Sequence, residues 1–133
     1  MRPLRPGLAV AVTMFSACAG GSEGGASTPS PVSAVVTFRV QAELFRVKLT
    51  TSAQVEAAKA AKAGGSARIP NGRIAAGTDV NTGWSWHLED VTFADATIEL
   101  CDGLPSYVEQ QGVEFGGGRF CPWTAVIVSI DTP

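Results

Sequence analysis

The pattern of hydrophobic and polar positions divides the chain into extended runs and one helical run. Residues 34–40 and 43–49 are rich in β-branched and aromatic residues and partly alternate, which predicts two strands paired as a hairpin. Side chains alternate between the two faces of a strand, so Phe45, Val47 and Leu49 share one face. We expect that face to lie on the core.

A helix is predicted directly after this hairpin. Thr51 and Gln54 have the spacing of a capping box, in which the two side chains satisfy each other's free backbone donors. Residues 53–63 are nearly all strong helix formers, and Gly64 and Gly65 supply a left-handed stop. Only a narrow apolar stripe runs along this segment, which favours a surface helix lying on a sheet.

Further extended segments follow the helix. We predict a strand over residues 68–77, broken at the turn dipeptide Asn71-Gly72, and extended segments over 80–88 and 91–100. Residues 124–130 form the clearest strand of the chain. Their unbroken apolar run predicts a central position in the sheet.

A second, short helix is predicted between the last strands. Asp102 is expected to cap it, Pro105 is tolerated in its first turn, and Gly112 ends it. The order of the elements predicts an α+β fold, with a mainly antiparallel sheet and two short helices.

Residues 1–18 have the features of an export signal, and we expect them to be a signal peptide of the lipoprotein type. Arg2 and Arg5 form a positive start, and the apolar run of 7–15 is shorter than the roughly 20 residues that span a bilayer. Small residues before Cys18 resemble a lipobox, which would make this cysteine the acylated N-terminus. Ordinary secretory cleavage that removes Cys18 is the alternative.

The predicted domain organisation follows from this signal. Residues 19–31 are rich in Gly, Ser and Pro and lack large apolar side chains, so they are expected to be a flexible tether. Residues 32–133 are expected to form a single domain. The predicted location is therefore extracytoplasmic, as a cell-envelope lipoprotein or, after loss of Cys18, as a secreted protein.

Composition and charge narrow the class of protein. A chain of 133 residues with 45% hydrophobic residues has room for one modest core. The formal charge is −2, and removal of the signal with Arg2 and Arg5 leaves 8 basic against 12 acidic residues, or −4. The sequence also has no basic cluster. This balance argues against nucleic-acid binding, which needs a basic face to neutralise phosphates.

The remaining cysteines support export independently. Without Cys18 the chain has Cys101 and Cys121, and an even pair in an oxidising compartment usually forms a structural disulfide. Such a bridge would contribute about 3 kcal/mol of stability in the chain-entropy description. Trp123, beside Cys121, is expected to pack against it.

The densest group of candidate binding residues lies in 81–90. Trp84 and Trp86 share one face of an extended segment, either as a stacking platform for a sugar or peptide or as a buried pair at the edge of the core. His87 is the only histidine, so any acid–base chemistry that uses imidazole depends on it. Ser85 lies on the same face, yet no nucleophile elbow accompanies the two. Pairing of His87 with a local carboxylate is the interpretation we prefer to catalysis.

Carboxylates near this segment are the candidate metal ligands, and no other cofactor is predicted. Calcium takes six to eight oxygen ligands, and Glu89, Asp90 and Asp102 are the residues expected to supply them. Glu89 and Asp90 are expected to flank a turn. The spacing of these carboxylates matches no EF-hand loop. The alternative interpretation is that they are exposed to water and bind no metal.

A family resemblance covers nearly all of residues 35–130. The segments that carry it are 45–50, the alanine-rich helix, 71–74, 81–88, 98–102, 107–109 and 121–123. In this order they resemble a poorly characterised family of small secreted domains. That family is similar to the N-terminal module of a protein grouped with calcium-dependent cell-adhesion molecules. The resemblance implies that the protein is secreted, and that it acts in adhesion or depends on calcium. It assigns no catalytic residues.

Three functional hypotheses follow. The favoured one is an exported, membrane-tethered, non-enzymatic binding or adhesion module. Its expected partner is a cell-envelope or extracellular protein or a glycan, with the membrane contacted only through the lipid. The second is a small secreted inhibitor of an extracellular hydrolase, which would insert the glycine-rich loop of residues 116–119. The third is a hydrolase that uses His87.

Overall fold

The computed structural model describes residues 33–133, so the predictions for the signal peptide and the tether lie outside the described residues. Six strands form two three-stranded sheets in which every pair is antiparallel. The first sheet has the order β2 (Glu43–Leu49), β1 (Ala34–Val40) and β6 (Val126–Asp131). The second has the order β4 (Trp86–Ala94), β3 (Ile69–Ala76) and β5 (Arg119–Phe120). The predicted antiparallel α+β class is thus confirmed, with two sheets in place of one.

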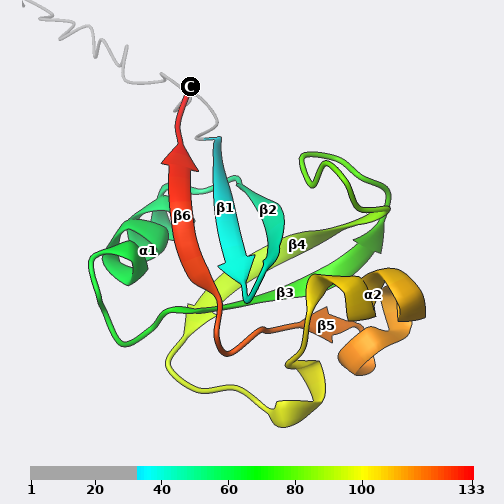
Figure 1. Cartoon of the computed structure of the whole chain (residues 1–133). Coiled ribbons are helices and arrows are strands. Elements are labelled where there is room, and N and C mark those ends of the chain that lie inside the picture. The colour runs from blue at the N-terminus through cyan, green and yellow to red at the C-terminus, as the bar shows by residue number, and fades with distance from the viewer. Residues whose placement is uncertain (1–32) are drawn as a thin grey trace, which may run out of the picture.

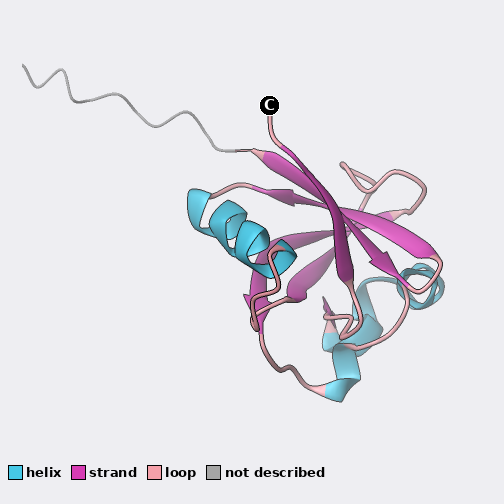
Figure 2. Ribbon diagram, turned by 60° about the vertical axis from the view of Figure 1, so that its left-hand side comes forward, coloured by secondary structure: helices cyan, strands magenta, loops and turns pink. Residues whose placement is uncertain are grey.

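The two sheets cross one behind the other, and the helices close the space between them at opposite ends (Figures 1 and 2). Helix α1 (Ser52–Lys62) contacts β4 and β6, whereas α2 (Pro105–Gln111) contacts β2. Two 3-10 segments, η1 (Glu99–Cys101) and η2 (Gly112–Gly117), flank α2. No helix within 33–133 is long and apolar enough to cross a bilayer.

Local predictions for the first part of the domain are confirmed. Strands β1 and β2 pair as a hairpin, and Phe45, Val47 and Leu49 are buried on its inner face. The capping box is present, because Gln54 N donates to Thr51 Oγ1 at 3.1 Å and Thr51 N donates to Gln54 Oε1 at 3.1 Å. Both contacts span three residues, so local sequence was sufficient to predict them.

The predicted central position of the last strand is wrong, because β6 forms an edge of its sheet. Strand β1 occupies the centre and pairs with β2 on one side and β6 on the other. Ile127 and Ile130 pack on the core, but Val126 and Val128 are 52% and 47% exposed. The apolar run therefore combines an inward face with an uncovered outward face.

The predicted breaks within the second sheet are bulges. Strand β3 continues through Asn71-Gly72, with a register shift between Asn71 and Arg73. A Cβ at Gly72 would lie 2.9 Å from both Leu88 Cβ and Val91 Cγ2, so glycine allows β3 and β4 to approach closely. Strand β4 likewise runs through the expected turn at Glu89-Asp90, where Asp90 has a φ of 52°. These two carboxylates therefore lie within one strand.

The start of α2 also differs from the prediction. Its N-cap is Leu104, which makes no side-chain cap, while Asp102 Oδ1 accepts a hydrogen bond from Trp123 N at 2.8 Å. Asp102 therefore joins the start of the helical region to the segment before β6. Pro105 in the first turn and Gly112 at the end, with a φ of 75°, are confirmed.

Aromatic rings connect the two sheets through the core. Phe38 and Phe45 stack with their ring centroids 5.0 Å apart, and Phe45 meets Phe120 of the second sheet edge to face at 5.3 Å. Phe120 in turn lies 5.5 Å from Trp86 and 5.9 Å from Phe115. Edge-to-face pairs at these distances add to the stabilisation from area burial alone.

One buried amide forms a polar connection between the sheets. Asn81 is fully buried, and its Oδ1 accepts a hydrogen bond from Arg46 N of β2 at 2.8 Å. Its Nδ2 donates to the carbonyl of Trp86, the first residue of β4, at 2.9 Å. The amide therefore satisfies a donor of one sheet and an acceptor of the other.

Replacement of Asn81 by alanine is expected to lower the free energy of unfolding by about 2–4 kcal/mol, because two backbone groups lose their partners. The neighbouring Thr82→Ala variant is the control, since it removes only the exposed hydrogen bond from Arg46 to Thr82, and should lose under about 1 kcal/mol. Urea unfolding of both variants measures the difference. Equal losses would contradict a bridging role for the amide.

Candidate functional site

The two tryptophans of the predicted binding segment lie together but differ in exposure. Their ring centroids are 6.1 Å apart. Trp86 is 2% exposed, and its Nε1 has no hydrogen-bond acceptor among the described residues. Trp84 is partly buried and donates its Nε1 hydrogen to the Leu44 carbonyl at 2.8 Å. Trp86 is thus part of the core, and Trp84 covers the edge of β2.

His87 lies on β4, where both of its ring nitrogens have partners. Nδ1 is 2.7 Å from the Gly77 carbonyl and Nε2 is 3.0 Å from Glu89 Oε1. Both partners are acceptors, so the doubly protonated ring satisfies both contacts. Burial disfavours the charge, but the hydrogen bonds to Gly77 and Glu89, with the nearby charges of Asp79 and Glu89, raise the pKa of His87 above 6.5.

A basic side chain organises the carboxylates beside His87. Arg73 on β3 donates to Glu89 and lies 3.4 Å from Asp90 Oδ2. The hydrogen bonds from His87 and Arg73 lower the pKa of Glu89. A hollow of about 250 Å³ adjoins this network, and its other lining residues are Lys48, Thr50, Gln54, Asp79 and Leu88. Its charged groups are largely paired with one another.

The three predicted calcium ligands do not gather into one group. Glu89 and Asp90 are engaged by Arg73, whereas Asp102 receives Trp123 N. No group of three or more His, Cys, Asp or Glu side chains in the described part of the chain is arranged to hold a metal ion. Calcium binding stays a prediction from sequence.

The structure does not pair the serine and histidine that a hydrolase would use. Ser85 Oγ donates to Glu109 Oε1 at 2.9 Å, and Ser85 N donates to the other oxygen of that carboxylate at 3.0 Å. Glu109 lies on α2, so this serine fastens the start of β4 to the helix. His87 makes its contacts with Gly77 and Glu89 instead.

Cys101 and Cys121 form the predicted disulfide, with their Cα atoms 5.1 Å apart. Trp123, two residues later, is 42% exposed, and its Nε1 donates to Thr97 Oγ1 at 2.6 Å. The indole is thus held against the segment that precedes η1. Much of the Trp123 indole is exposed to solvent, so this side chain is less buried than we expected for a residue packed against the disulfide.

The glycine-rich loop of residues 116–119 packs against the domain. A Cβ at Gly116 would lie 2.8 Å from Cys101 Cα, and the Gly118 carbonyl accepts a hydrogen bond from Ile74 N at 2.9 Å. Arg119 belongs to β5 and donates its Nε hydrogen to Asn71 Oδ1 at 2.8 Å. These contacts fix the loop and its arginine to the second sheet.

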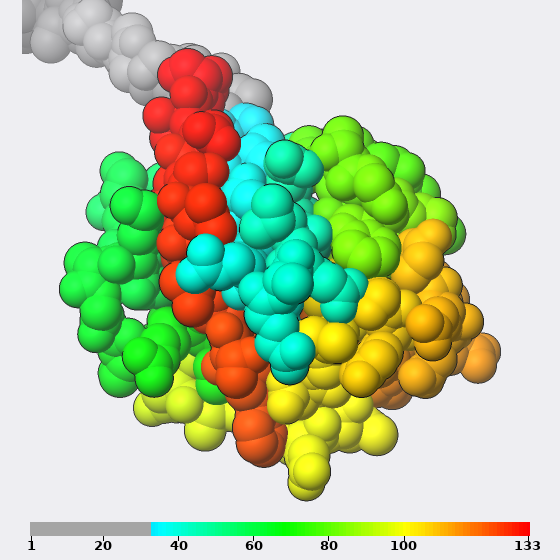
Figure 3. Space-filling model, in the orientation of Figure 1, coloured from blue at the N-terminus to red at the C-terminus, as the bar shows by residue number. Residues whose placement is uncertain are grey.

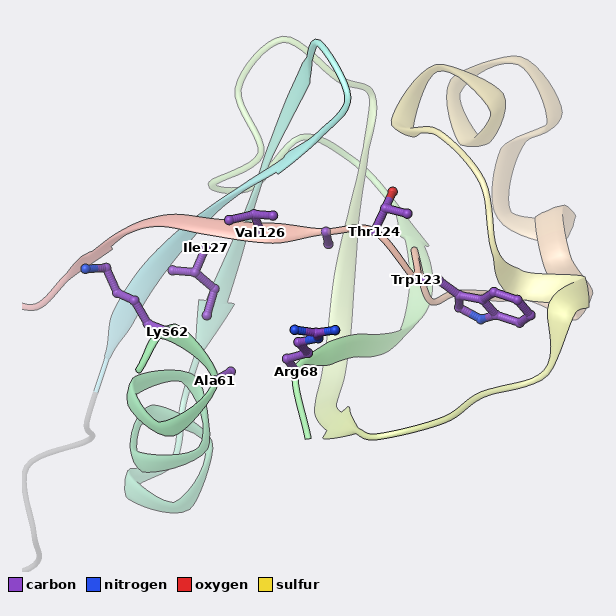
Figure 4. A pocket seen from close by; sticks show the side chains of 8 residues that line it. Ala61, Lys62, Arg68, Trp123, Thr124, Val126 and Ile127 are labelled. Carbon is purple, nitrogen blue, oxygen red and sulfur yellow. The ribbon is translucent and has the colours of Figure 1, made fainter. Parts of the chain in front are cut away.

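A second hollow, of about 370 Å³, lies between α1 and β6 (Figure 3). We call this hollow the groove. Figure 4 shows Lys62 and Arg68 on the same side of β6, with Ile127 directed between them. Residues 123–126 and Ala61 complete the lining. This groove was not predicted from the sequence, because Lys62 and Arg68 come from separate segments. The unbroken apolar run of residues 125–128 gave no signal either, because it does not distinguish exposed from inward positions.

The sequence profile described as the BP-74 N-terminal domain matches residues 32–133. The match covers most of the chain, so the chain belongs to the BP-74 N-terminal domain family. It agrees with the predicted resemblance to a family of N-terminal modules, whereas the likeness to calcium-dependent adhesion proteins stays a prediction. Neither a curated protein nor a solved structure matched the chain.

The elevated pKa of His87 predicts a pH-dependent contribution to stability. The contribution is fully present below 6.5, the ordinary value, and is lost as pH rises through the elevated pKa of the folded state. The free-energy difference between the natural chain and its His87→Gln variant should therefore shrink from pH 6 to higher pH. Urea unfolding across this range measures it.

A direct titration provides the control. His87 is the only histidine, so its imidazole resonance in a proton NMR spectrum of the full chain needs no assignment. The apparent pKa should lie above 6.5 and should fall in the Glu89→Gln variant, which loses the carboxylate at Nε2. A pKa at or below 6.5 in the natural chain would contradict the described network.

Proposed function

We propose that the chain is an exported, non-enzymatic binding module that a lipid on Cys18 holds at the cell surface. Its partner is a cell-envelope or extracellular protein or a glycan. The disulfide supports the export part of this proposal, since such bridges persist in oxidising compartments. The N-terminal export signal and the tether predicted from sequence support the surface location.

The observation that carries the binding function is the groove between α1 and β6. It is the larger hollow described above, and it combines cationic side chains, an apolar wall and the backbone of an edge strand. Its lining contains neither a carboxylate nor a histidine or cysteine that would serve acid–base or nucleophilic chemistry. The cationic and apolar side chains of the groove suit the binding of a partner.

The state of His87 supports the non-enzymatic part of the proposal. A general base needs a free nitrogen within reach of its substrate, whereas the two nitrogens of His87 contact Gly77 and Glu89. The inhibitor hypothesis draws no support from the loop of residues 116–119, since Gly116 packs on Cys101 and Arg119 is tied to Asn71. With these two alternatives unsupported, binding of a partner, and adhesion through it, is the function that we propose.

Binding is tested with the full chain immobilised in its oxidised form. Extracellular and envelope proteins from the producing cells and an array of glycans are the probes, and saturable binding to at least one of them is expected. The same chain after reduction and heat unfolding is the control and should lose that binding. Absence of saturable binding to every probe would refute the proposed function.

Anchoring is tested by fractionation of bacterial cells that express the full gene. We expect the natural chain in the membrane pellet and the Cys18→Ser variant in the soluble extracytoplasmic fraction, because loss of the thiol removes the acylation site. Mass spectrometry of the mature N-terminus is the control. A natural chain that begins after Cys18 without a lipid would contradict the anchor and leave secretion in its place.

A further inference from the structure

The two outer edges of the first sheet differ in their hydrogen bonding to the rest of the chain. Along β2, Asn81 accepts a hydrogen bond from Arg46 N, and Trp84 donates one to the Leu44 carbonyl. These side chains occupy the edge of β2 that faces away from β1. Along β6, no side chain within residues 33–133 forms a hydrogen bond to the backbone, and β1 is its sole partner strand. The outer backbone groups of β6 therefore have no hydrogen-bond partner among the described residues.

The charged side chains that line the groove beside β6 have one sign. Lys62 at the end of α1 and Arg68 before β3 are exposed, and neither forms an ion pair with another described residue. No acidic side chain lines the groove. The whole chain nevertheless has a net charge of −2, so this groove is a local exception. Its cations attract a negatively charged ligand.

The apolar surface beside the edge supplies further contact area. Val126 and Val128 are about half exposed, and Trp123 at the end of the groove is 42% exposed. Alternate exposed side chains along a strand fit the side chains of a second strand laid beside it. An unpaired strand edge is a template for another chain, and recognition by strand addition uses it.

We propose that the free edge of β6 binds an extended, acidic peptide segment of a partner protein as an added strand. The backbone of β6 supplies the hydrogen bonds, and Lys62 and Arg68 pair with carboxylates of the peptide. Ile127 and Trp123 provide apolar contacts along the groove. The inference rests on the proposed binding function and specifies the chemistry of the partner.

A second copy of this chain fits the edge less well. Pairing of two β6 strands would bring the Lys62 and Arg68 of both copies to one interface, where like charges repel each other. The register shift of β6 against β1 between Thr37 and Phe38 also interrupts the edge, and such bulges hinder the pairing of long edges. A short acidic segment avoids the repulsion, because its carboxylates would face Lys62 and Arg68 with opposite charge.

The affinity test uses the oxidised full chain and a fluorescein-labelled seven-residue peptide that alternates glutamate with valine. A glutamine–valine peptide of the same length is the neutral control and should bind more weakly. Fluorescence anisotropy at low salt is expected to show about fivefold weaker binding of the glutamate peptide to Lys62→Glu and to Arg68→Glu. Lys59→Glu changes the net charge equally on the same helix but lies outside the groove lining, and it should bind within about twofold of the natural chain.

The strand geometry has a separate test in the peptide backbone. Two versions of the glutamate peptide carry N-methyl groups on alternate residues, in opposite registers. In an added strand only one set of amides faces β6, so one version should lose at least about tenfold in affinity and the other should keep it. Amide resonance shifts on binding should centre on β6. Equal behaviour of the two versions, or shifts elsewhere, would overturn strand addition.

The outcomes separate this inference from the proposed function. Unchanged peptide affinity in both Lys62→Glu and Arg68→Glu would overturn the inference. A second result would also overturn it: the natural chain does not bind the peptide, and the two variants self-associate in sedimentation velocity. Lys62 and Arg68 would then serve to prevent aggregation through the strand edge. A chain that binds an extracellular protein or glycan in either case keeps its binding function and loses only this partner class.

Discussion

The side-chain amide of Asn81 is the contact on which the arrangement of the two sheets depends. It connects Arg46 in β2 to Trp86 at the start of β4, so the first sheet fixes where β4 begins. The segment before β4 must therefore fold over the edge of β2, and Trp84 comes to lie against Leu44. The same constraint sets the position of His87 along β4. A buried amide has no equivalent apolar replacement, because it serves a donor and an acceptor together.

Several predictions from neighbouring residues are confirmed, whereas others failed because contacts with distant segments overrode the local signal, as at Asp102, which accepts a hydrogen bond from Trp123 N. The capping box of Thr51 and the inner face of β2 follow from short-range spacing. The dipeptide Asn71-Gly72 signals a turn locally, yet close packing against β4 makes it a bulge. The position of β6 depends on which strand pairs with β1, some 90 residues earlier. No local pattern contains that information.

The candidate site shows the same limit. Pairing of His87 with a local carboxylate, Glu89 or Asp90, was predicted from their nearness in sequence, and the partner is Glu89. Arg73, which engages the same carboxylate, and Glu109, which holds Ser85, come from other elements. The groove beside β6 is an extreme case, because its cations lie on separate segments of an acidic chain. Net charge describes the whole molecule and conceals a local reversal of sign.

The pairing of β1 with β6 has a consequence for folding under the export that we propose. Val35 of β1 lies opposite Asp131 of β6, so the first sheet is complete only once β6 is available. Contacts between such distant residues form slowly, since a long loop closes before they stabilise anything. Cys121 also emerges late, and the bridge to Cys101 forms only afterwards. A chain exported in the proposed way would thus stay incompletely folded until β6 has been synthesised, and such a chain can cross a membrane in an extended form.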